Sequence, residues 1–280
     1  MLSILLYNIF LYTYSFAIRI AALKSIKARQ WINGRKDWRS RLAEFKHNLI
    51  LETNNNQHQI LWMHCASLGE FEQGRPVLEQ LKTKIPFLKI VVTFFSPSGY
   101  EVRKNYDKAD LIFYLPIDSQ KNAKDFISIL QPSLALWIKY EFWYYYLKEL
   151  HSNNIPVLLV SGIFRKDQPF FKWYGGLYKK MLQYFTCIFV QNETSKALAL
   201  KIPKKDIIVS GDTRFDRVIQ IAQQPFNNIV IEKWLQGATK IIVAGSTWDE
   251  DHEVLVHYVK LHPDIKWIIA PHNVDEEQIN

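Results

Sequence analysis

The stretch His64-Cys65-Ala66-Ser67-Leu68-Gly69-Glu70 decides the fold class of this chain. It follows an apolar run, Ile60–Met63, that predicts a buried strand, and it precedes a helical pattern over Phe71–Leu81. A turn of small residues at the carboxyl end of a parallel strand is where α/β proteins place their ligands. Here the turn brings Glu70 to a helix start, where the helix dipole favours negative charge. Glu70 is therefore either a functional carboxylate or a residue that only caps the helix.

Strand and helix patterns alternate from residue 59 onward, which predicts an α/β fold with a doubly wound parallel sheet. The expected strands are Ile60–Met63, Lys89–Thr93, Leu111–Tyr114, Leu134–Trp137, Val157–Val160, Cys187–Val190 and Ile207–Val209. The expected helices lie near Phe71–Leu81, Ser98–Asn105, Lys121–Leu130, Glu141–Leu150, Phe170–Tyr184 and Thr194–Leu200. Because parallel strands all end at one edge of a sheet, we expect the loops that follow them to line one crevice.

The stretch Ile221–Asn228, which contains Gln223-Gln224-Pro225, predicts a linker between domains. A second α/β pattern follows it. That pattern is a strand at Lys240–Ala244, a helix at Asp249–Leu261 and a strand at Lys266–Ala270. Two parallel strands bury little surface and leave their edges unpaired. We therefore expect an incomplete second domain in this chain. The expected divisions are a membrane anchor (1–22), a basic membrane-proximal segment (23–58), a first Rossmann-like domain (59–222) and the start of a second (229–280).

The first eighteen residues carry no charge, and this length just reaches that of a membrane span. Nine Lys and Arg residues and only two acids follow between Arg19 and Lys46, which by the positive-inside rule predicts a cytoplasmic globular part. Tyrosines and polar residues weaken the apolar character of the segment. The alternatives are an amphipathic helix on the membrane surface and an ordinary buried first helix. A cleaved signal peptide fits poorly, because no positive charge precedes the apolar run.

The net charge of +8 indicates anionic partners, namely phosphates, nucleic acid or anionic lipid. The two cysteines, Cys65 and Cys187, are far apart, which predicts reduced thiols in a cytosolic environment and no zinc site. No Gly-x-Gly-x-x-Gly follows the first strand and no Walker loop is present. Dinucleotide binding is therefore not expected.

Glu141 is a second candidate carboxylate, because it lies in apolar company between Trp137 and Trp143. A carboxylate in such surroundings is costly unless it has a partner. Glu141 is therefore either in a salt bridge with Lys139 or a neighbouring arginine, or placed beside a reaction centre. The other candidate substrate-binding residues on the expected crevice are Ser67, Gly69, Thr93, Ser96, Gly99 and Lys139.

Three further turns carry candidate phosphate contacts. Arg214, in Gly211–Asp216, can neutralise a leaving phosphate or simply pair with Asp212 or Asp216 on the surface. The turn Gly245-Ser246-Thr247 opens a helix, where free N–H groups and a hydroxyl can hold a phosphate or only cap the helix. Pro271-His272 ends the next strand, and a plain turn explains it equally well.

In their order along the chain, these motifs resemble the 3-deoxy-D-manno-octulosonic acid (Kdo) transferases of lipid A biosynthesis. The resemblance rests on His64–Glu70, the Thr93–Gly99 loop, Trp137–Trp143, Gly211–Asp216 and Ala244–Thr247, and it covers essentially the whole chain. It implies a GT-B fold, in which two Rossmann-like domains face a cleft, the first binding the acceptor and the second the donor. It implies CMP-Kdo as donor, a lipid A precursor (lipid IVA) as acceptor, no metal or other cofactor, and a place at the cytoplasmic face of the bacterial inner membrane.

The resemblance also implies residue roles. Glu70 matches the family's general base and Glu141 the acidic residue that stabilises the transition state. Arg214 stands where the family usually has a lysine, and Asp212 where it has an asparagine. Ser246, Thr247, Pro271 and His272 match the donor side, although this chain has Pro271-His272-Asn273 where the family commonly has Pro-Arg-His. Direct attack by the acceptor hydroxyl, assisted by one base, predicts inversion at the anomeric carbon of the transferred sugar.

Two other functions remain open on the residues. The first is a GT-B glycosyltransferase that uses another nucleotide sugar. The second is a truncated, non-catalytic relative that binds lipid A. The expected partners are CMP-Kdo, the lipid A precursor and inner-membrane lipid, and no nucleic acid.

Overall fold

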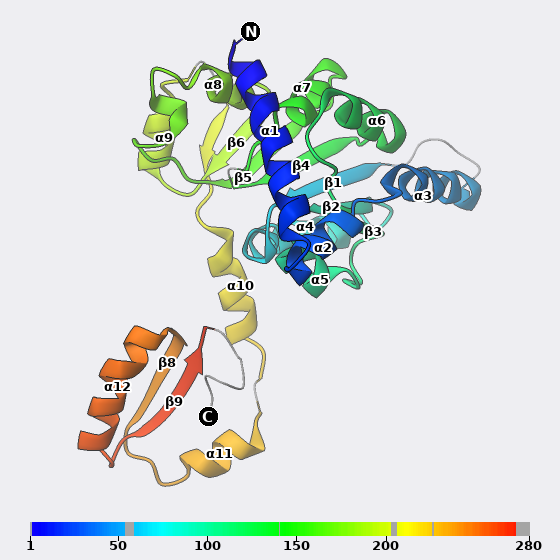
Figure 1. Ribbon diagram of the computed structural model, residues 1–280. Helices are drawn as coiled ribbons and strands as arrows, with labels where there is room; N and C mark the ends of the chain where they lie inside the picture. Colours follow the sequence, from blue (N-terminus) through cyan, green and yellow to red (C-terminus); the bar gives the residue numbers. More distant parts are fainter. Residues whose placement is uncertain (1, 54–58, 140, 203–205, 226, 273–280) are drawn as a thin grey trace. The chain divides into compact units, whose positions relative to one another are not determined.

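The computed structural model describes residues 2–53, 59–139, 141–202, 206–225 and 227–272. It divides into two compact units, Met1–Ile221 and Ala222–Asn280, coloured blue to yellow and yellow to red in Figure 1. Tyr140 and Asn273, which belong to motifs named above, lie outside the described residues.

Unit 1 contains a seven-stranded sheet in the order β3-β2-β1-β4-β5-β6-β7. Every neighbouring pair is parallel, which confirms the doubly wound sheet. The strand order reverses between β1 and β4, and ligands of open α/β sheets bind outside the carboxyl ends at such a point. The strands are β1 (Ile60–Cys65), β2 (Lys89–Phe94), β3 (Leu111–Tyr114), β4 (Leu134–Ile138), β5 (Val157–Gly162), β6 (Cys187–Val190) and β7 (Ile207–Val209).

Helices connect these strands as expected, with two differences. The connecting helices are α4 (Leu68–Lys84), α5 (Pro97–Arg103), α6 (Gln120–Leu130), α7 (Tyr144–Ser152), α8 (Gly176–Gln183) and α9 (Glu193–Ala199). A further helix, α10 (Thr213–Ala222), follows β7 and was not predicted from the sequence. The helix expected at Phe170–Tyr184 is instead a short 3₁₀ turn, Pro169–Phe171, followed by α8. The chain turns between them where Gly175 lies so close to the carbonyl of Pro169 that a side chain would clash. The second difference is that Glu141 precedes α7 rather than beginning it.

Strand β1 separates two hydrophobic clusters, one on each face of the sheet. Ile60 and Trp62 pack with residues of α6 and α7, whereas Leu61 and Met63 pack with residues of α4 on the other face. All four are essentially inaccessible to solvent. This alternation is the period of a strand covered on both faces, which explains why Ile60–Met63 is continuously apolar.

Three helices precede the sheet: α1 (Leu2–Ala21), α2 (Ile26–Asn33) and α3 (Trp38–Thr53). By length and composition α1 can cross a membrane. Figure 1 shows α1 lying across unit 1, and it contacts α2 and α8. Leu11 is buried in the core, and Tyr14 packs against Trp31 and Phe95. The opposite side of α1 is exposed and apolar, and includes Leu5, Ile9, Phe16 and Ile20.

Unit 2 is one β-α-β element preceded by a short helix. It consists of α11 (Ile229–Leu235), β8 (Ile241–Thr247), α12 (Asp249–Leu261) and β9 (Lys266–Pro271). The two strands pair in parallel, as the sequence predicts. Many of its apolar side chains are exposed, including Val243, Val254 and Leu261.

Candidate functional site: buried carboxyl groups at the edge of the sheet

Glu70 lies in the first turn of α4, directly after β1, and its residue is only 8% exposed. Its Oε2 accepts a 2.5 Å hydrogen bond from the backbone N–H of Ala66, which precedes the helix, so Glu70 fixes the turn between β1 and α4. Its Oε1 has no hydrogen-bond partner within the described chain and is not fully buried. Burial raises the pKa of Glu70 to about 7, with the nearby charge of Glu141 adding to the rise. Glu70 is therefore a held carboxyl group with one free oxygen that exchanges a proton near neutral pH.

Glu141 lies in the loop between β4 and α7, and burial also raises its pKa to about 7. Of the two alternatives for Glu141, the salt bridge with Lys139 is not found among the described residues. Its buried Oε2 has no hydrogen-bond partner there and lies 3.8 Å from His64 Nε2. The backbone of the loop is held by Trp137, whose indole N–H donates a 2.6 Å hydrogen bond to the carbonyl of Glu141. The site thus holds two carboxyl groups whose charges disfavour each other.

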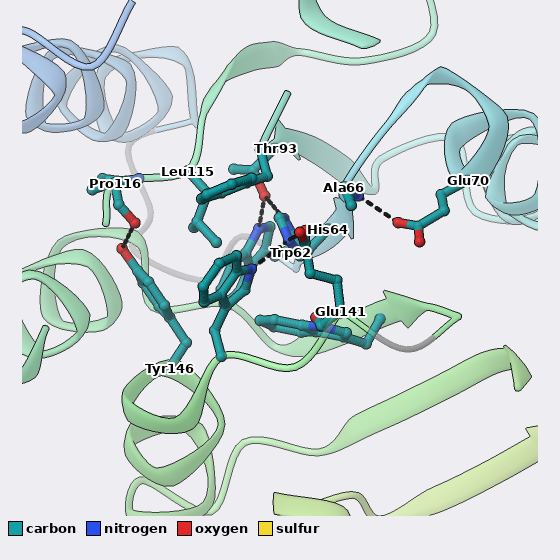
Figure 2. Close-up of polar contacts among 12 residues, drawn as sticks. Trp62, His64, Ala66, Glu70, Thr93, Leu115, Pro116, Glu141 and Tyr146 are labelled. Carbon is teal, nitrogen blue, oxygen red and sulfur yellow. Dashed lines mark hydrogen bonds and ion pairs between the residues drawn. The ribbon is translucent and has the colours of Figure 1, made fainter. Parts of the chain in front are cut away.

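His64 fills the space behind these carboxyl groups. The Trp143 indole N–H donates to His64 Nε2 (3.1 Å), and because an indole only donates, Nε2 carries the lone pair. The proton of the neutral ring is then on Nδ1, which donates to the Thr93 hydroxyl (2.9 Å). That hydroxyl also accepts from Trp62 (2.8 Å), and Figure 2 shows these contacts. Burial lowers the pKa of His64 to about 3, so His64 is a neutral support rather than the base.

Lys139, which follows β4, has a left-handed backbone conformation with φ of 61°. This conformation is energetically unfavourable for a residue with a Cβ, and strained backbone of this kind is concentrated at functional sites. The positive charge of Lys139 acts to lower the pKa of Glu70, against the larger effect of burial. The structure therefore brings Glu70, Glu141 and Lys139 together at the carboxyl edge of the sheet.

The other acceptor-side candidates differ in accessibility. Ser67 and Gly69 are at least partly exposed beside Glu70, and no atom lies within 4 Å of the position that a Gly69 side chain would take. Ser96 hydrogen-bonds to Ser98 (2.6 Å) at the exposed start of α5. Gly99 is buried against Phe94. Thr93 is fully buried beneath His64, so we assign it support of the site rather than contact with an acceptor.

Arg214 forms the pair with Asp212 that the sequence left as one of its alternatives, at 2.6 Å. Asp212 also accepts from the backbone N–H of Arg214 and from Gln73 of α4. The Arg214 side chain is 61% exposed, so its charge can still reach a ligand if the pair opens. Its predicted contact with a leaving group stays a prediction.

The four donor-side candidates meet at the carboxyl ends of β8 and β9. Ser246, in a left-handed conformation, hydrogen-bonds to His272 (2.9 Å), and Thr247 to His252 (2.7 Å). Pro271 ends β9. The first turn of α12 is acidic, and one of its acids, Asp251, accepts the N–H of Trp248. These carboxylates disfavour a phosphate at the start of this helix. The turn therefore offers hydroxyl groups to a ligand but binds a phosphate poorly.

Sequence reasoning did not single out Arg35 or Asp118. Arg35 is partly buried between aromatic rings, 3.8 Å from the centroid of Trp31, and donates to the carbonyls of Trp31, Phe95 and Leu115. Burial lowers the pKa of Arg35 to about 9, and its charge opposes the rise in the pKa of Glu141. An arginine in a basic segment shows no local sign of such burial. Asp118 did have a signal, since it follows the third strand.

The family model for 3-deoxy-D-manno-octulosonic-acid transferase (kdotransferase) matches residues 36–217. A 3-deoxy-D-manno-octulosonic acid transferase of Haemophilus influenzae is 27% identical, over 64% of this chain and 43% of its own. The 3-deoxy-D-manno-octulosonic acid transferase of Aquifex aeolicus is 25% identical, over 81% of this chain and 59% of its own. A bifunctional glycosyltransferase/methyltransferase of Fusobacterium nucleatum is 25% identical, over 78% of this chain and 35% of its own. The chain thus spans roughly a third to three fifths of the lengths of these relatives.

Solved structures show the same fold at low sequence identity. A UDP-GlcNAc 2-epimerase from Neisseria meningitidis has a TM-score of 0.56 and 17% identity, over 78% of this chain and 66% of its own. A putative UDP-N-acetylglucosamine 2-epimerase from Listeria monocytogenes has a TM-score of 0.57 and 12% identity, over 79% and 64%. The fold is of the GT-B type, the class shared by nucleotide-sugar glycosyltransferases and epimerases. Within that class, the chain belongs to the Kdo transferase family.

Proposed function

We propose that this chain carries the acceptor side of an enzyme that transfers Kdo from CMP-Kdo to a lipid A precursor. The observation that supports this most is Glu70, a carboxyl group fixed by the Ala66 N–H, with one free oxygen and a pKa of about 7. A general base works best when its pKa lies near the operating pH. Its neighbour Glu141 supplies the second carboxyl group that the family resemblance calls for.

In the proposed reaction, a sugar hydroxyl of the acceptor attacks the anomeric carbon of Kdo. Its oxygen forms the new glycosidic bond, its proton passes to Glu70 Oε1, and the bond to CMP breaks with the electron pair leaving on the phosphate. Attack opposite to the leaving group inverts the anomeric carbon. Positive charge develops on the sugar ring, and the negative form of Glu141 stabilises it. No metal or other cofactor takes part in this proposal; Arg214 offsets charge on the leaving phosphate once it releases Asp212.

The proposed location is the cytoplasmic face of the bacterial inner membrane. One side of α1 packs on unit 1 through Leu11 and Tyr14, while Leu5, Ile9 and Phe16 on its other side are exposed. A helix held in this way lies flat in the membrane interface, with the basic segment after it near anionic headgroups. Of the two membrane modes that the sequence left open, this geometry favours the surface-lying helix.

The test is sugar transfer by the full-length protein with CMP-Kdo and tetraacylated lipid A precursor. Glu70→Gln keeps an oxygen that can accept the Ala66 N–H but cannot take a proton, so transfer should slow by about 10²–10⁴-fold while the fold persists. Glu44→Gln, which neutralises an exposed carboxylate on α3, is the matched control. Undiminished transfer by Glu70→Gln would remove Glu70 from the mechanism. Transfer from a UDP- or GDP-sugar but not from CMP-Kdo would show that the protein is a glycosyltransferase with another donor. Binding of lipid A without turnover would show that it is a non-catalytic relative.

A further inference from the structure

A groove that neither Glu70 nor Glu141 lines runs beside α1. Its first wall is a stripe of α1 that includes Asn8, Ser15 and Arg19, and its second wall is the turn between β3 and α6. Two adjoining cavities, of about 500 and 300 Å³, share Ser15, Arg19, Ile117 and Asn122. The second continues past Trp31 and Trp38. No sequence pattern indicates a role for the polar residues on this stripe of an otherwise apolar helix.

The groove offers hydrogen-bond donors. Arg19 and Lys121 have no hydrogen-bond or ion-pair partner in the described ranges of the chain. The indole N–H of Trp31, which lines the second cavity and is only 6% exposed, has no acceptor among the described residues, although the nitrogen itself is not accessible to solvent. In the first turn of α6, Ser119 accepts from the N–H of Asn122, and the N–H groups of Gln120 and Lys121 have no partner within the helix. An anion is the ligand that a set of free donors and two free cations favours.

Three side-chain acceptors on the same walls, including the carboxylate, are already engaged. Asp118 accepts from Tyr7 and from two backbone N–H groups of α7. Asn122 Oδ1 accepts from Arg39, and Asn8 Oδ1 accepts from Tyr145. A cation entering the groove would therefore find no free carboxylate, whereas an anion finds free donors on both walls.

The groove also has apolar surface, which bears on the kind of anion. Leu11 and Ile117 line it, and the neighbouring residues of α1 on the outside, Ile9 and Phe16, are 49% and 64% exposed. A ligand with a charged head and apolar chains matches this combination, because its chains can follow the exposed side of α1.

We infer that this groove binds the phosphodiester headgroup of an anionic bilayer phospholipid, with the phosphate between Arg19 and Lys121. The headgroup would fix the orientation of unit 1 on the bilayer, in addition to the unspecific pull of the basic segment. This inference shares the membrane location with the proposed function but does not depend on sugar transfer, so its test uses binding alone.

The test is native mass spectrometry of the full chain in mild detergent, with phosphatidylglycerol or phosphatidylcholine added. We expect one bound phosphatidylglycerol per chain and at least about tenfold weaker binding of phosphatidylcholine. Ser15→Trp fills the groove without changing the charge and should weaken phosphatidylglycerol binding by about tenfold or more. Ser3→Trp, on the exposed part of α1, should leave it unchanged.

A second pair of variants tests the charge. Lys121→Gln should weaken phosphatidylglycerol binding, whereas Lys124→Gln removes an equal charge from the same helix outside the groove and should not. Normal binding by Ser15→Trp, or equal losses in the two lysine variants, would overturn the inference and leave only unspecific attraction. Inorganic phosphate that displaces the lipid at equal concentration would also overturn it, as evidence for a small-anion site. Circular dichroism of each variant establishes that it is folded.

Discussion

The hydroxyl of Tyr7 donates a 2.6 Å hydrogen bond to the carboxyl group of Asp118. Asp118 is buried and also accepts from the backbone N–H groups of Tyr145 (2.9 Å) and Tyr146 (3.0 Å), which caps the start of α7. One carboxyl group therefore ties α1 to the helix that directly follows the Glu141 loop. It follows that α1 is part of the packed structure of unit 1.

Tyr7→Phe should lower the free energy of unfolding of unit 1 by about 1–2 kcal/mol, because a buried carboxyl group loses a donor and the ring is kept. Chemical denaturation followed by circular dichroism measures this loss. Tyr12→Phe, on the exposed side of the same helix, is the control and should change stability by less than about 0.5 kcal/mol. Equal effects of the two variants would mean that the Tyr7–Asp118 bond adds nothing to stability.

The stability of unit 1 should fall as the pH rises from about 5 to 8. Burial raises the pKa of Asp118 to about 6 and those of Glu70 and Glu141 to about 7, all above their ordinary values. A carboxyl group with a raised pKa contributes stability below its unfolded pKa and loses it as pH passes through the folded pKa. Unfolding free energies measured across this range should therefore slope downward. The double variant Glu70→Gln/Glu141→Gln should have a shallower slope, and an unchanged slope would contradict the assignment.

Much of the sheet can be predicted from sequence, because each strand is a short apolar run between helical patterns. The start of α7 cannot be predicted in this way, since it depends on residues that are distant in sequence. The pattern extends to Glu141, but Asp118, some 27 residues earlier, caps the helix at Tyr145, and Trp137 holds the carbonyl of Glu141. Glu141 therefore lies in a fixed loop that no local pattern indicates.

The site shows the same division. Glu70 was predictable because a strand–turn–helix boundary places it at the sheet edge, whatever the rest of the chain does. The roles of His64 and Arg35 arise only from packing: the first is surrounded by Trp62, Thr93 and Trp143, and the second by three carbonyls from separate elements. Neither set of partners is adjacent in sequence, so no motif reveals them.

His64 should remain neutral with its proton on Nδ1 from about pH 5 to 9, because burial lowers its pKa to about 3. Nitrogen-15 chemical shifts of the imidazole ring measure both its charge and its tautomer. In Trp143→Phe the donor to Nε2 is lost, and the Nε2 resonance alone should move strongly. A ring that titrates near its ordinary pKa in the unaltered protein would show that the buried network is not formed.

Arg35→Lys should destabilise unit 1 by at least about 2 kcal/mol, although the charge is kept. The flat guanidinium donates to the carbonyls of Trp31, Phe95 and Leu115 and stacks on the Trp31 ring, and an ammonium group cannot do both. Arg29→Lys on α2, which donates to backbone carbonyls on the exposed surface, is the matched control and should be nearly neutral. Thermal unfolding compares the two; similar small changes would show that the stacked geometry of Arg35 is unimportant.

The rate of sugar transfer should rise with pH and level off above about pH 7, because Glu70 must lose its proton before it can accept one from the acceptor hydroxyl. Glu141→Gln removes a neighbouring negative charge that helps to raise the pKa of Glu70, so its profile should level off at a lower pH as well as at a lower rate. Glu70→Gln should lose about 10²–10⁴-fold in rate and with it the rising limb. Initial rates of the full-length protein with saturating donor measure all three profiles. A rising limb that persists in Glu70→Gln would assign the proton transfer to another group.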